Sequence, residues 1–307
     1  MEKAKFSIFD AIGNTPLVEL RNINGNRKVR LLGKFEGSNP GGSVKDRPAY
    51  YMISKAEKSG ELTRDKMIVE PTSGNMGIAL AMIGTAKGYG IKLFMPECVS
   101  TERQGALIAL GAELILTPAD EGTDGAIRRA RQLMSEEPEK CYMPNQFDNE
   151  SNVLAHYETT GPEVFSQTDG EVDVFVAGMG TTGTLMGVGR YLQEKKPGVK
   201  IVGVEPTEGH TIQGLKNMNE AIVPMIYNPD IFDEKVVVED DEAFATTRML
   251  ATREGLFLGM SSGAAVAAAL RIARKMSQGT IVVILPDRGD RYLSTTLFRS
   301  VCAKCPP

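Results

Sequence analysis

Short apolar and β-branched runs alternate along the chain with longer stretches in which apolar residues recur at helical spacing. The runs predict strands at residues 29–36, 67–70, 92–95, 113–116, 141–143, 172–177, 199–204, 235–238 and 280–285. The helical stretches fall near residues 77–88, 101–111, 122–135, 183–195, 240–253 and 262–277. Strands and helices that alternate at this spacing predict parallel sheets. Two such series, with a boundary near residue 150, predict an α/β protein with two doubly wound domains.

Composition and charge limit the classes of function. The 307 residues are 42% hydrophobic and 24% charged, as is typical of a globular protein with a substantial core. The net charge of −4 gives no sign of a nucleic-acid or membrane-surface partner. The longest apolar runs, at residues 263–270 and 281–286, are too short to span a membrane. The two histidines, His156 and His210, lie far apart, so no histidine-rich metal site is expected.

The amino-terminal residues and the cysteines predict a cytoplasmic protein. Residues 1–5 run into mixed polar sequence, without the apolar core that a secretory signal requires. Four cysteines, Cys98, Cys141, Cys302 and Cys305, are too few for a disulfide framework, which agrees with a reducing compartment. Cys302 and Cys305 form a C-x-x-C motif at the extreme end of the chain. With no second pair nearby, the motif favours a frayed terminus over a zinc or redox site.

The chemistry is expected to centre on Lys45, in the turn-rich segment NPGGSVKDR at residues 39–47. This segment follows a predicted strand, its glycines are free to take positive φ, and a helix is predicted to begin near residues 45–46. A lysine in the first turn faces the positive end of the helix dipole, which should ease the loss of its proton. Such a lysine can act as an amine nucleophile. The same local sequence also fits a solvated surface lysine.

Two further loops follow predicted strands and open predicted helices. Residues 71–77 (PTSGNMG) present hydroxyls, an amide and free backbone N–H groups of the kind that bind a carboxylate or phosphate, although an ordinary capped turn has the same pattern. Residues 178–184 (GMGTTGT) combine glycines with three threonines and have the chemistry of an anion cradle. Ligands of doubly wound folds bind beyond the carboxyl ends of the strands, so the loops should meet there.

The second of these loops leaves two cofactors open. Gly178, Gly180 and Gly183 spell G-x-G-x-x-G, and Glu205, at the end of the next predicted strand, supplies the acidic residue of the dinucleotide fingerprint. This pattern predicts an NAD-dependent dehydrogenase. Three threonine hydroxyls, however, suit a single terminal phosphate better than a pyrophosphate. The loop by itself supports both interpretations.

Five segments, in their order and spacing, resemble the cysteine synthase family, whose members are fold-type II enzymes that depend on pyridoxal 5′-phosphate (PLP). They are NPGGSVKDR at 39–47, PTSGN at 71–75, GTTGT at 180–184, SSG at 261–263 and DRGDRYLST at 287–295. The similarity runs from residues 13–16 to about residue 298, and the last segment together with GTTGT makes the chain most similar to the B-type O-acetylserine sulfhydrylases. The resemblance implies a tryptophan synthase β-like fold with PLP in the cleft between two domains. Residues 38–150 would form the smaller, mobile domain, and residues 1–37 with 151–307 the larger one.

The resemblance also implies a role for each loop, residue by residue. Lys45 is expected to bind PLP covalently, Asn75 to contact the PLP ring oxygen, and Ser261 to face the pyridine nitrogen. The phosphate cradle would consist of Gly180, Thr181, Thr182, Gly183 and Thr184. Thr72, Ser73 and Gln146 would hold the substrate carboxylate. Met76 stands where the family usually has threonine, so this loop must rely more on backbone N–H groups.

The implied reaction is β-replacement, in which an activated serine loses the leaving group at its β-carbon and sulfide adds there to give L-cysteine. Closure of the smaller domain is expected to keep water away from the reacting atoms. O-acetylserine and O-phosphoserine differ mainly in charge, and Lys216 is the candidate sensor of a phosphate. Cystathionine β-synthases, which use serine and homocysteine, share the loop at 39–47, and a non-catalytic member is a further alternative. The family implies a homodimer whose other partners are small molecules.

Overall fold

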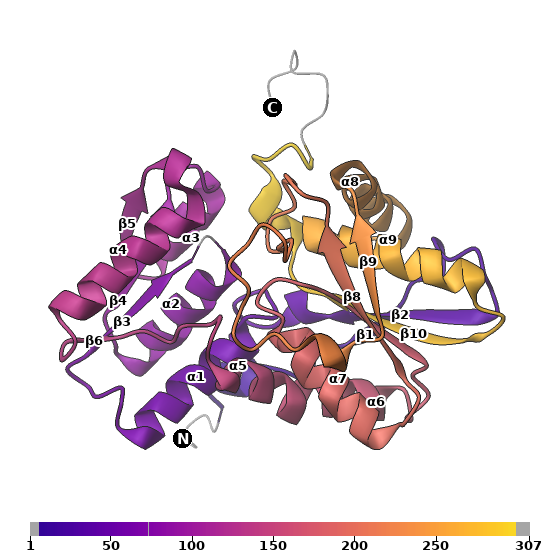
Figure 1. Ribbon diagram of the computed structural model, residues 1–307, viewed down its shortest axis with the longest axis horizontal. Helices are drawn as coiled ribbons and strands as arrows, with labels where there is room; N and C mark the ends of the chain where they lie inside the picture. The colour runs from indigo at the N-terminus through magenta and orange to yellow at the C-terminus, as the bar shows by residue number, and fades with distance from the viewer. Residues whose placement is uncertain (1–5, 73, 299–307) are drawn as a thin grey trace, which may run out of the picture.

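The fold contains two β-sheets that lie next to each other, with helices packed on both faces of each sheet (Figure 1). The structure is a computed structural model that describes residues 6–72 and 74–298. Within these residues, one sheet has six strands in the order β1-β2-β10-β7-β8-β9, and the other has four in the order β5-β4-β3-β6. The predicted α/β fold with two parallel-sheet units is confirmed.

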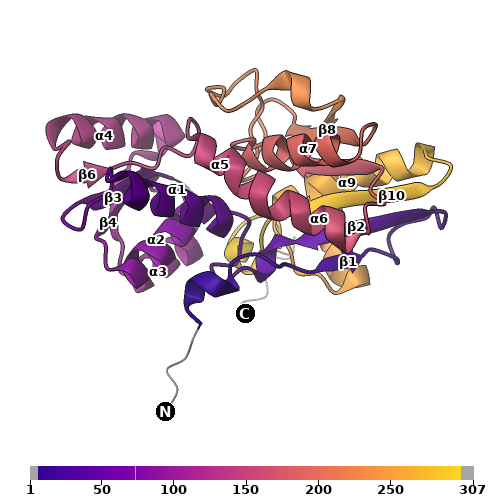
Figure 2. The same cartoon turned by 90° about the horizontal axis from the view of Figure 1, so that it is seen from below.

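The smaller sheet consists of parallel strands from the first half of the chain. They are β3 (Met67–Pro71), β4 (Ile91–Pro96), β5 (Glu113–Thr117) and β6 (Cys141–Tyr142). Helices α1 (Asp46–Ser59), α2 (Asn75–Lys87) and α3 (Thr101–Ala109) cover one face, and α4 (Gly122–Glu136) covers the other (Figure 2). Ile68 packs in the core beneath α1 and α2, whereas its neighbour Val69 packs against Ala126 of α4. This alternation follows from the two-residue period of a strand.

The larger sheet combines strands from both ends of the chain. Its parallel strands are β2 (Val29–Phe35), β7 (Val174–Gly178), β8 (Lys200–Pro206), β9 (Glu234–Val238) and β10 (Gly279–Leu285). Helices α8 (Asp240–Met249) and α9 (Met260–Lys275) cover one face, and α5 (Glu150–Ala155), α6 (Gly161–Gln167) and α7 (Gly183–Lys195) cover the other. Val176 packs under α9, and Phe175 packs under α7. Both faces are therefore buried.

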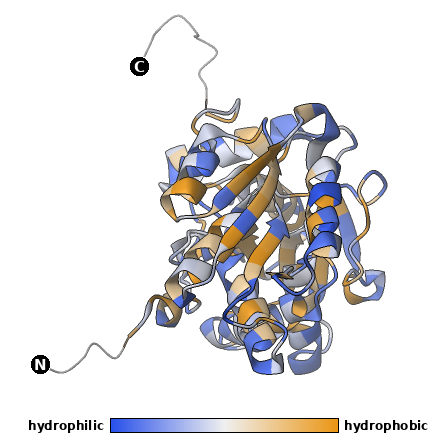
Figure 3. Ribbon diagram, turned by 90° about the vertical axis from the view of Figure 1, so that its left-hand side faces the viewer, coloured by the Kyte–Doolittle hydropathy of each residue, from blue (hydrophilic) through white to orange (hydrophobic). Residues whose placement is uncertain are grey.

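Burial on both faces explains why the strands could be predicted from continuous apolar runs. Figure 3 shows hydrophobic residues gathered along the interior strands, and hydrophilic residues mainly on the outer parts of the helices. In β10, Ile281 and Val283 belong to one core and Val282 to the other. Each sheet thus has one layer of buried side chains on each of its two faces.

Two parts of the fold differ from the sequence prediction. Strand β1 (Leu17–Glu19) pairs antiparallel with β2, so the larger sheet is not entirely parallel. The second part is the segment that follows β6, where α5 continues into a π-helical turn, η4 (His156–Thr160), and then into α6. The three residues of β1 are too few for a periodic signal, and a π-helical turn interrupts the 3.6-residue repeat on which helix prediction rests.

The carboxyl ends of five parallel strands lead into the loops that carry the candidate residues. Lys45 follows β2, Thr72 follows β3, Gln146 follows β6, Gly180 follows β7, and Asp287 follows β10. A doubly wound fold places its ligand at these ends. No helix in the described part of the chain is long and apolar enough to cross a membrane. The domain boundaries at residues 38 and 150 stay a prediction.

Candidate active site

A pocket of about 230 Å³, lined by loops of both sheets, collects most of the predicted site residues. Those on its wall are Lys45, Thr72, Asn75, Gln146, Gly180, Thr181, Thr182, Thr184 and Ser261. Gly183 is buried at the first position of α7, within the same loop. Ser73 lies outside the described residues. The three candidate loops thus meet, as their positions after parallel strands require.

Lys45 reaches the pocket from a loop that is fastened to the end of β10. The Gly42 N–H donates to the Asn39 carbonyl at 2.7 Å, and Gly42 takes a φ of 79°, a left-handed conformation that favours glycine. The Val44 N–H donates to the Pro286 carbonyl at 2.8 Å. Lys45 is then the N-cap residue of α1. The fold of the loop thereby fixes where the Lys45 side chain enters the pocket.

The amine of Lys45 is easier to deprotonate than that of an ordinary lysine. Burial lowers the pKa of Lys45 to about 8, while the charge of Asp287 acts in the opposite direction. An appreciable fraction of the amine is therefore neutral near physiological pH and available as a nucleophile. From the sequence, the helix dipole was expected to lower the pKa of Lys45. The structure adds burial in the pocket as a cause.

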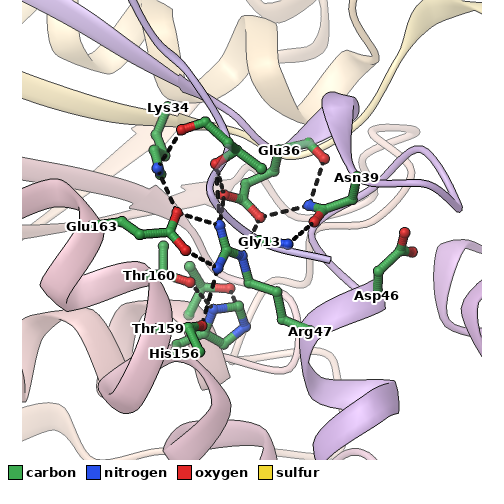
Figure 4. A network of polar contacts seen from close by, with 12 residues as sticks. Gly13, Lys34, Glu36, Asn39, Asp46, Arg47, His156, Thr159, Thr160 and Glu163 are labelled. Atoms are coloured by element: carbon green, nitrogen blue, oxygen red, sulfur yellow. Dashed lines mark hydrogen bonds and ion pairs between the residues drawn. The ribbon is translucent and has the colours of Figure 1, made fainter. Parts of the chain in front are cut away.

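A buried ionic network holds the segment that carries Lys45 (Figure 4). The Arg47 guanidinium donates to both carboxylate oxygens of Glu36, at 2.7 and 2.8 Å, and to both oxygens of Glu163, at 2.7 Å. Lys34 donates to Glu163 at 2.7 Å as well. Two cations and two carboxylates balance each other, as burial of charge requires. The network joins the start of α1 to β2 and α6.

The loop after β7 combines close backbone approach with an unsatisfied hydroxyl. A Cβ atom on Gly180 would lie 2.5 Å from the Gly214 carbonyl oxygen, so only glycine fits there. Thr182 has a φ of 69°, and its buried Oγ1 has no hydrogen-bond partner among the described residues. The first backbone N–H groups of α7 follow directly. An anion at this helix N-terminus would satisfy both the hydroxyl and the N–H groups.

The other two threonines of this loop contact the segment α5–η4. Thr181 Oγ1 accepts a hydrogen bond from Asn152 Nδ2 at 3.1 Å, so its own proton remains available for donation. Thr184 Oγ1 lies 3.2 Å from Nε2 of His156. Both threonines are thus oriented by side chains outside the predicted loop.

Thr72 and Gln146 lie on the pocket wall at the smaller sheet. Glu70 orients the Gln146 loop, because its carboxylate accepts hydrogen bonds from the backbone N–H groups of Asn145, at 2.9 Å, and Gln146, at 3.2 Å. Burial raises the pKa of Glu70 to about 7, although these N–H groups act in the opposite direction. Met76 is buried and also lines the pocket, where it offers no hydroxyl.

The side chain of Asn75 is held by the loop after β10. Asn75 Nδ2 donates to Asp287 Oδ2 at 2.6 Å, and its Oδ1 accepts from Arg291. Tyr292 also donates to Asp287 Oδ2, at 2.6 Å, while Asp287 Oδ1 is buried without a partner in residues 6–72 and 74–298. One of the two N–H groups of the Asn75 amide remains for a ligand.

Ser261 and Lys216 complete the polar lining at the larger sheet. Ser261 is buried in the first turn of α9. The Lys216 Nζ lies 4.1 Å from the ring centroid of Phe147, a cation–π contact that places the amine on the pocket wall. Burial lowers the pKa of Lys216, and Asp124 opposes this effect.

The acidic residue of the dinucleotide fingerprint is engaged elsewhere. Glu205 is buried, forms an ion pair with the Nζ of Lys235 at 2.8 Å, and accepts from the Met218 N–H at 2.8 Å. A nicotinamide dinucleotide requires such a carboxylate to be free for the ribose hydroxyls. The geometry of Glu205 therefore disfavours the dehydrogenase interpretation.

Sequence reasoning missed several residues that orient the predicted ones. Asn152, His156 and Glu70 contact the candidate loops but carry no motif of their own. Asp287 begins the segment DRGDRYLST, but no role in the site was predicted for it. The bond between Asn75 and Asp287 joins residues 212 positions apart in the chain. Local sequence holds no signal for such contacts, which exist only once the loops meet.

Comparison with known proteins identifies the family to which this chain belongs. Residues 8–287 match the pyridoxal-phosphate dependent enzyme family. Cysteine synthase B from Pseudomonas aeruginosa is 48% identical over 292 residues, which cover 95% of this chain and 97% of that protein. Cysteine synthase B from Salmonella typhimurium is 49% identical over 287 residues, covering 94% of each. This chain belongs to the cysteine synthase family.

A solved structure agrees with membership of the cysteine synthase family. O-acetyl serine sulfhydrylase isoform 3 from Entamoeba histolytica matches with a TM-score of 0.91 at 39% identity, and the match covers 98% of this chain and 93% of that chain. The predicted resemblance to B-type cysteine synthases, the fold-type II architecture and the dependence on PLP are confirmed. The roles given to individual residues stay predictions.

Proposed function

We propose that this member of the cysteine synthase family makes L-cysteine from O-acetylserine and sulfide by PLP-dependent β-replacement. The observation that carries the proposal is the position of Lys45, whose amine has a pKa of about 8 and shares one pocket with two anion-binding loops. These loops open helices α7 and α2. The first suits a phosphate and the second a carboxylate. A cofactor phosphate and an amino-acid carboxylate would thus bind near the same amine.

The residues on the pocket wall fit PLP. The buried, unpartnered hydroxyl of Thr182 and the close backbone approach at Gly180 suit a phosphate. The Lys45 amine suits an aldehyde, and Asn75 has an N–H to spare for the ring oxygen. A neutral hydroxyl at Ser261 would face the pyridine nitrogen without holding a positive charge on it. Such a contact favours elimination and replacement over transamination.

When bound, PLP supplies a conjugated system that stabilises negative charge at the α-carbon of the substrate. The amine of Lys45 would accept the α-proton of the bound substrate at Nζ. Lys45 then returns this proton to the α-carbon after acetate has left the β-carbon and sulfide has added there. The balance is O-acetylserine and hydrosulfide (HS⁻) giving L-cysteine and acetate.

The substrate carboxylate would be held by Thr72, Gln146 and the first backbone N–H groups of α2. Glu70 contributes indirectly, because its hydrogen bonds fix the backbone of Gln146. Met76 adds only apolar surface, whereas a threonine at this position would offer the carboxylate a hydroxyl. The backbone N–H groups must therefore contribute more of the binding. Ser73, which we assign to the same task, lies outside the described residues.

Domain organisation, assembly and location complete the proposal. Residues 38–150, which include every strand of the smaller sheet, form the domain that closes over the substrate and excludes water. Residues 1–37 and 151–307 form the larger domain. We expect a homodimer, as the family resemblance implies. A cytoplasmic location agrees with Cys98 and Cys141, which are free cysteines in the part of the chain that the structure describes.

An assay of the purified, PLP-loaded protein tests the function directly. O-acetylserine, O-phosphoserine and serine are each offered with sulfide and with homocysteine, and the products are separated. We expect L-cysteine and acetate from O-acetylserine and sulfide as the fastest reaction. Cystathionine as the main product would show instead that the chain catalyses the β-replacement of serine with homocysteine. No product from any pair would support the non-catalytic alternative.

The O-phosphoserine arm of this assay also tests Lys216. If Lys216 senses a phosphate, Lys216→Met should slow the reaction of O-phosphoserine and leave that of O-acetylserine nearly unchanged. Equal rates of O-phosphoserine turnover in wild type and variant would remove Lys216 from substrate recognition.

A further inference from the structure

His156 is a fully buried histidine that connects the phosphate cradle to the π-helical turn η4. Its Nε2 lies 3.2 Å from Thr184 Oγ1, and its Nδ1 lies 2.8 Å from Thr160 Oγ1. Figure 4 shows the ring beside Thr160, close to the network around Arg47. π-Helical turns are rare and often mark functional sites. Here the turn brings His156 to the cradle and Thr159 to the Arg47 guanidinium, at 3.1 Å.

The imidazole of His156 is neutral in this environment. Burial lowers the pKa of His156 well below its usual value, and the charges of Arg47 and Lys45 act in the same direction, against Glu163. A neutral imidazole has one nitrogen that donates and one that accepts. Each ring nitrogen faces a threonine hydroxyl, which can take either role. The structure of the protein alone therefore permits two tautomers.

A phosphate in the cradle removes this ambiguity. Above pH 7 the phosphate group is largely a dianion, which can only accept hydrogen bonds. Thr184 has one hydroxyl proton, and a bond to the phosphate uses it. Thr184 Oγ1 can then only accept from His156, so Nε2 must carry the ring proton. Nδ1 is left to accept the proton of Thr160.

We propose that His156 is a positioning residue for the cofactor phosphate, whose Nε2–H donates to Thr184 Oγ1 and thereby directs the Thr184 hydroxyl proton toward the phosphate. The inference rests on the proposed function, because it takes the bound phosphate to be that of PLP. The Thr160 hydroxyl then donates to Nδ1, the Nε2–H group donates to Thr184 Oγ1, and the Thr184 hydroxyl donates to the phosphate. In this arrangement His156 acts through Thr184 and does not touch the cofactor.

Nitrogen NMR of the PLP-loaded protein at pH 8 tests the tautomer. The chain has two histidines, so a His210→Gln variant labelled with ¹⁵N-histidine reports on His156 alone. We expect Nε2 to have the shift of a protonated ring nitrogen and Nδ1 that of an unprotonated one. A proton on Nδ1, or on both nitrogens, would overturn the proposal. PLP uptake is checked by absorbance: a protein that takes up no PLP contradicts the proposed function, whereas bound PLP with Nδ1 protonated contradicts only the role of His156.

A pair of variants separates the hydrogen bond from the volume of the ring. His156→Gln keeps an N–H donor that reaches the position of Nε2, and His156→Met has a similar size without a donor. We expect the PLP affinity of His156→Gln to stay within a few-fold of wild type and that of His156→Met to fall by roughly ten-fold. Equal losses in both variants would reduce His156 to a packing role.

Discussion

Thr182 combines two features that are unfavourable for the free protein. Its φ of 69° is rare for a β-branched residue, and its buried hydroxyl has no partner among the described residues. Strained backbone and unsatisfied polar groups concentrate at functional sites, where a ligand compensates for their cost. Both features are explained if the hydroxyl binds the cofactor phosphate.

Thr182→Val therefore should change stability and cofactor affinity in opposite directions. Valine keeps the shape and removes an unsatisfied hydroxyl, so urea unfolding of the cofactor-free protein should show equal or slightly higher stability. PLP affinity, measured by titration, should fall about ten- to a hundred-fold, because a hydrogen bond to a charged group contributes about 1.5–3 kcal/mol.

Thr117→Val is the matched control for this experiment. Thr117 Oγ1 is also buried without a partner in the described part of the chain, but Thr117 lies at the end of β5 and is not part of the pocket lining. Removal of the Thr117 hydroxyl should affect stability in the same way as removal of the Thr182 hydroxyl, and it should leave PLP affinity unchanged. Equal PLP affinity in wild type and Thr182→Val would place the phosphate elsewhere.

Residues with local chemistry could be predicted from the sequence, and residues defined by long-range contacts could not. The glycines and threonines near Thr182 carry their own signal, because a tight turn before a helix limits which residues fit. Ser261 has no such signal and was assigned from the family resemblance. His156 and Asp287 acquire their contacts only when α5–η4 and the loop after β10 pack against the cradle and Asn75.

At the scale of elements, the network around Arg47 joins the start of α1, which packs on the smaller sheet, to β2 and α6 of the larger sheet. Arg47 and Glu36 are 1% and 0% exposed, so neither charge can be satisfied by water if its partner is lost. Burial would raise the pKa of Glu163, but the hydrogen bonds and charges of Arg47 and Lys34 outweigh it and lower this pKa to about 2. The carboxylate is thus ionised whenever the protein is folded near neutral pH.

Arg47→Met should destabilise the cofactor-free protein by about 3–5 kcal/mol, because the buried carboxylate of Glu36 and the largely buried carboxylate of Glu163 would lose the cation that pairs with both of them. The measurement is urea unfolding near pH 7, with the slope of the transition compared between proteins. Arg128→Met is the control, since the ion pair of Arg128 with Glu121 is exposed and should contribute at most about 1 kcal/mol. A loss below 1 kcal/mol in Arg47→Met would show that the network does not hold α1.

The helices and strands could be predicted where their periodicity is uninterrupted. Strands such as β7 and β10 are buried on both faces and appear as continuous apolar runs. Helix α7 was predicted over its full length, because Gly183 follows a turn and Lys195 precedes Pro197 in the sequence. The segment from α5 to α6 escaped prediction because the π-helical turn η4 shifts the repeat in its middle.

At the scale of the whole molecule, the pocket depends on both sheets. The cradle and Ser261 belong to the larger sheet and its helices, while Thr72, Asn75 and Gln146 follow strands of the smaller one. Lys45 lies between them, after β2 of the larger sheet and before α1 on the smaller. The fold class followed from the alternation of elements, but the pairing of β2 with β10 across the chain could not be read from local sequence.

The central claim is that Lys45 forms the covalent bond to PLP. The measurement is reduction of the PLP-loaded protein with borohydride, followed by peptide mapping by mass spectrometry. We predict that the cofactor mass appears on the peptide that contains Lys45, that Lys45→Ala carries no label, and that Lys216→Ala is labelled like wild type. A label on Lys216, the other lysine of the pocket wall in the described chain, or no label in the wild-type protein would contradict the account.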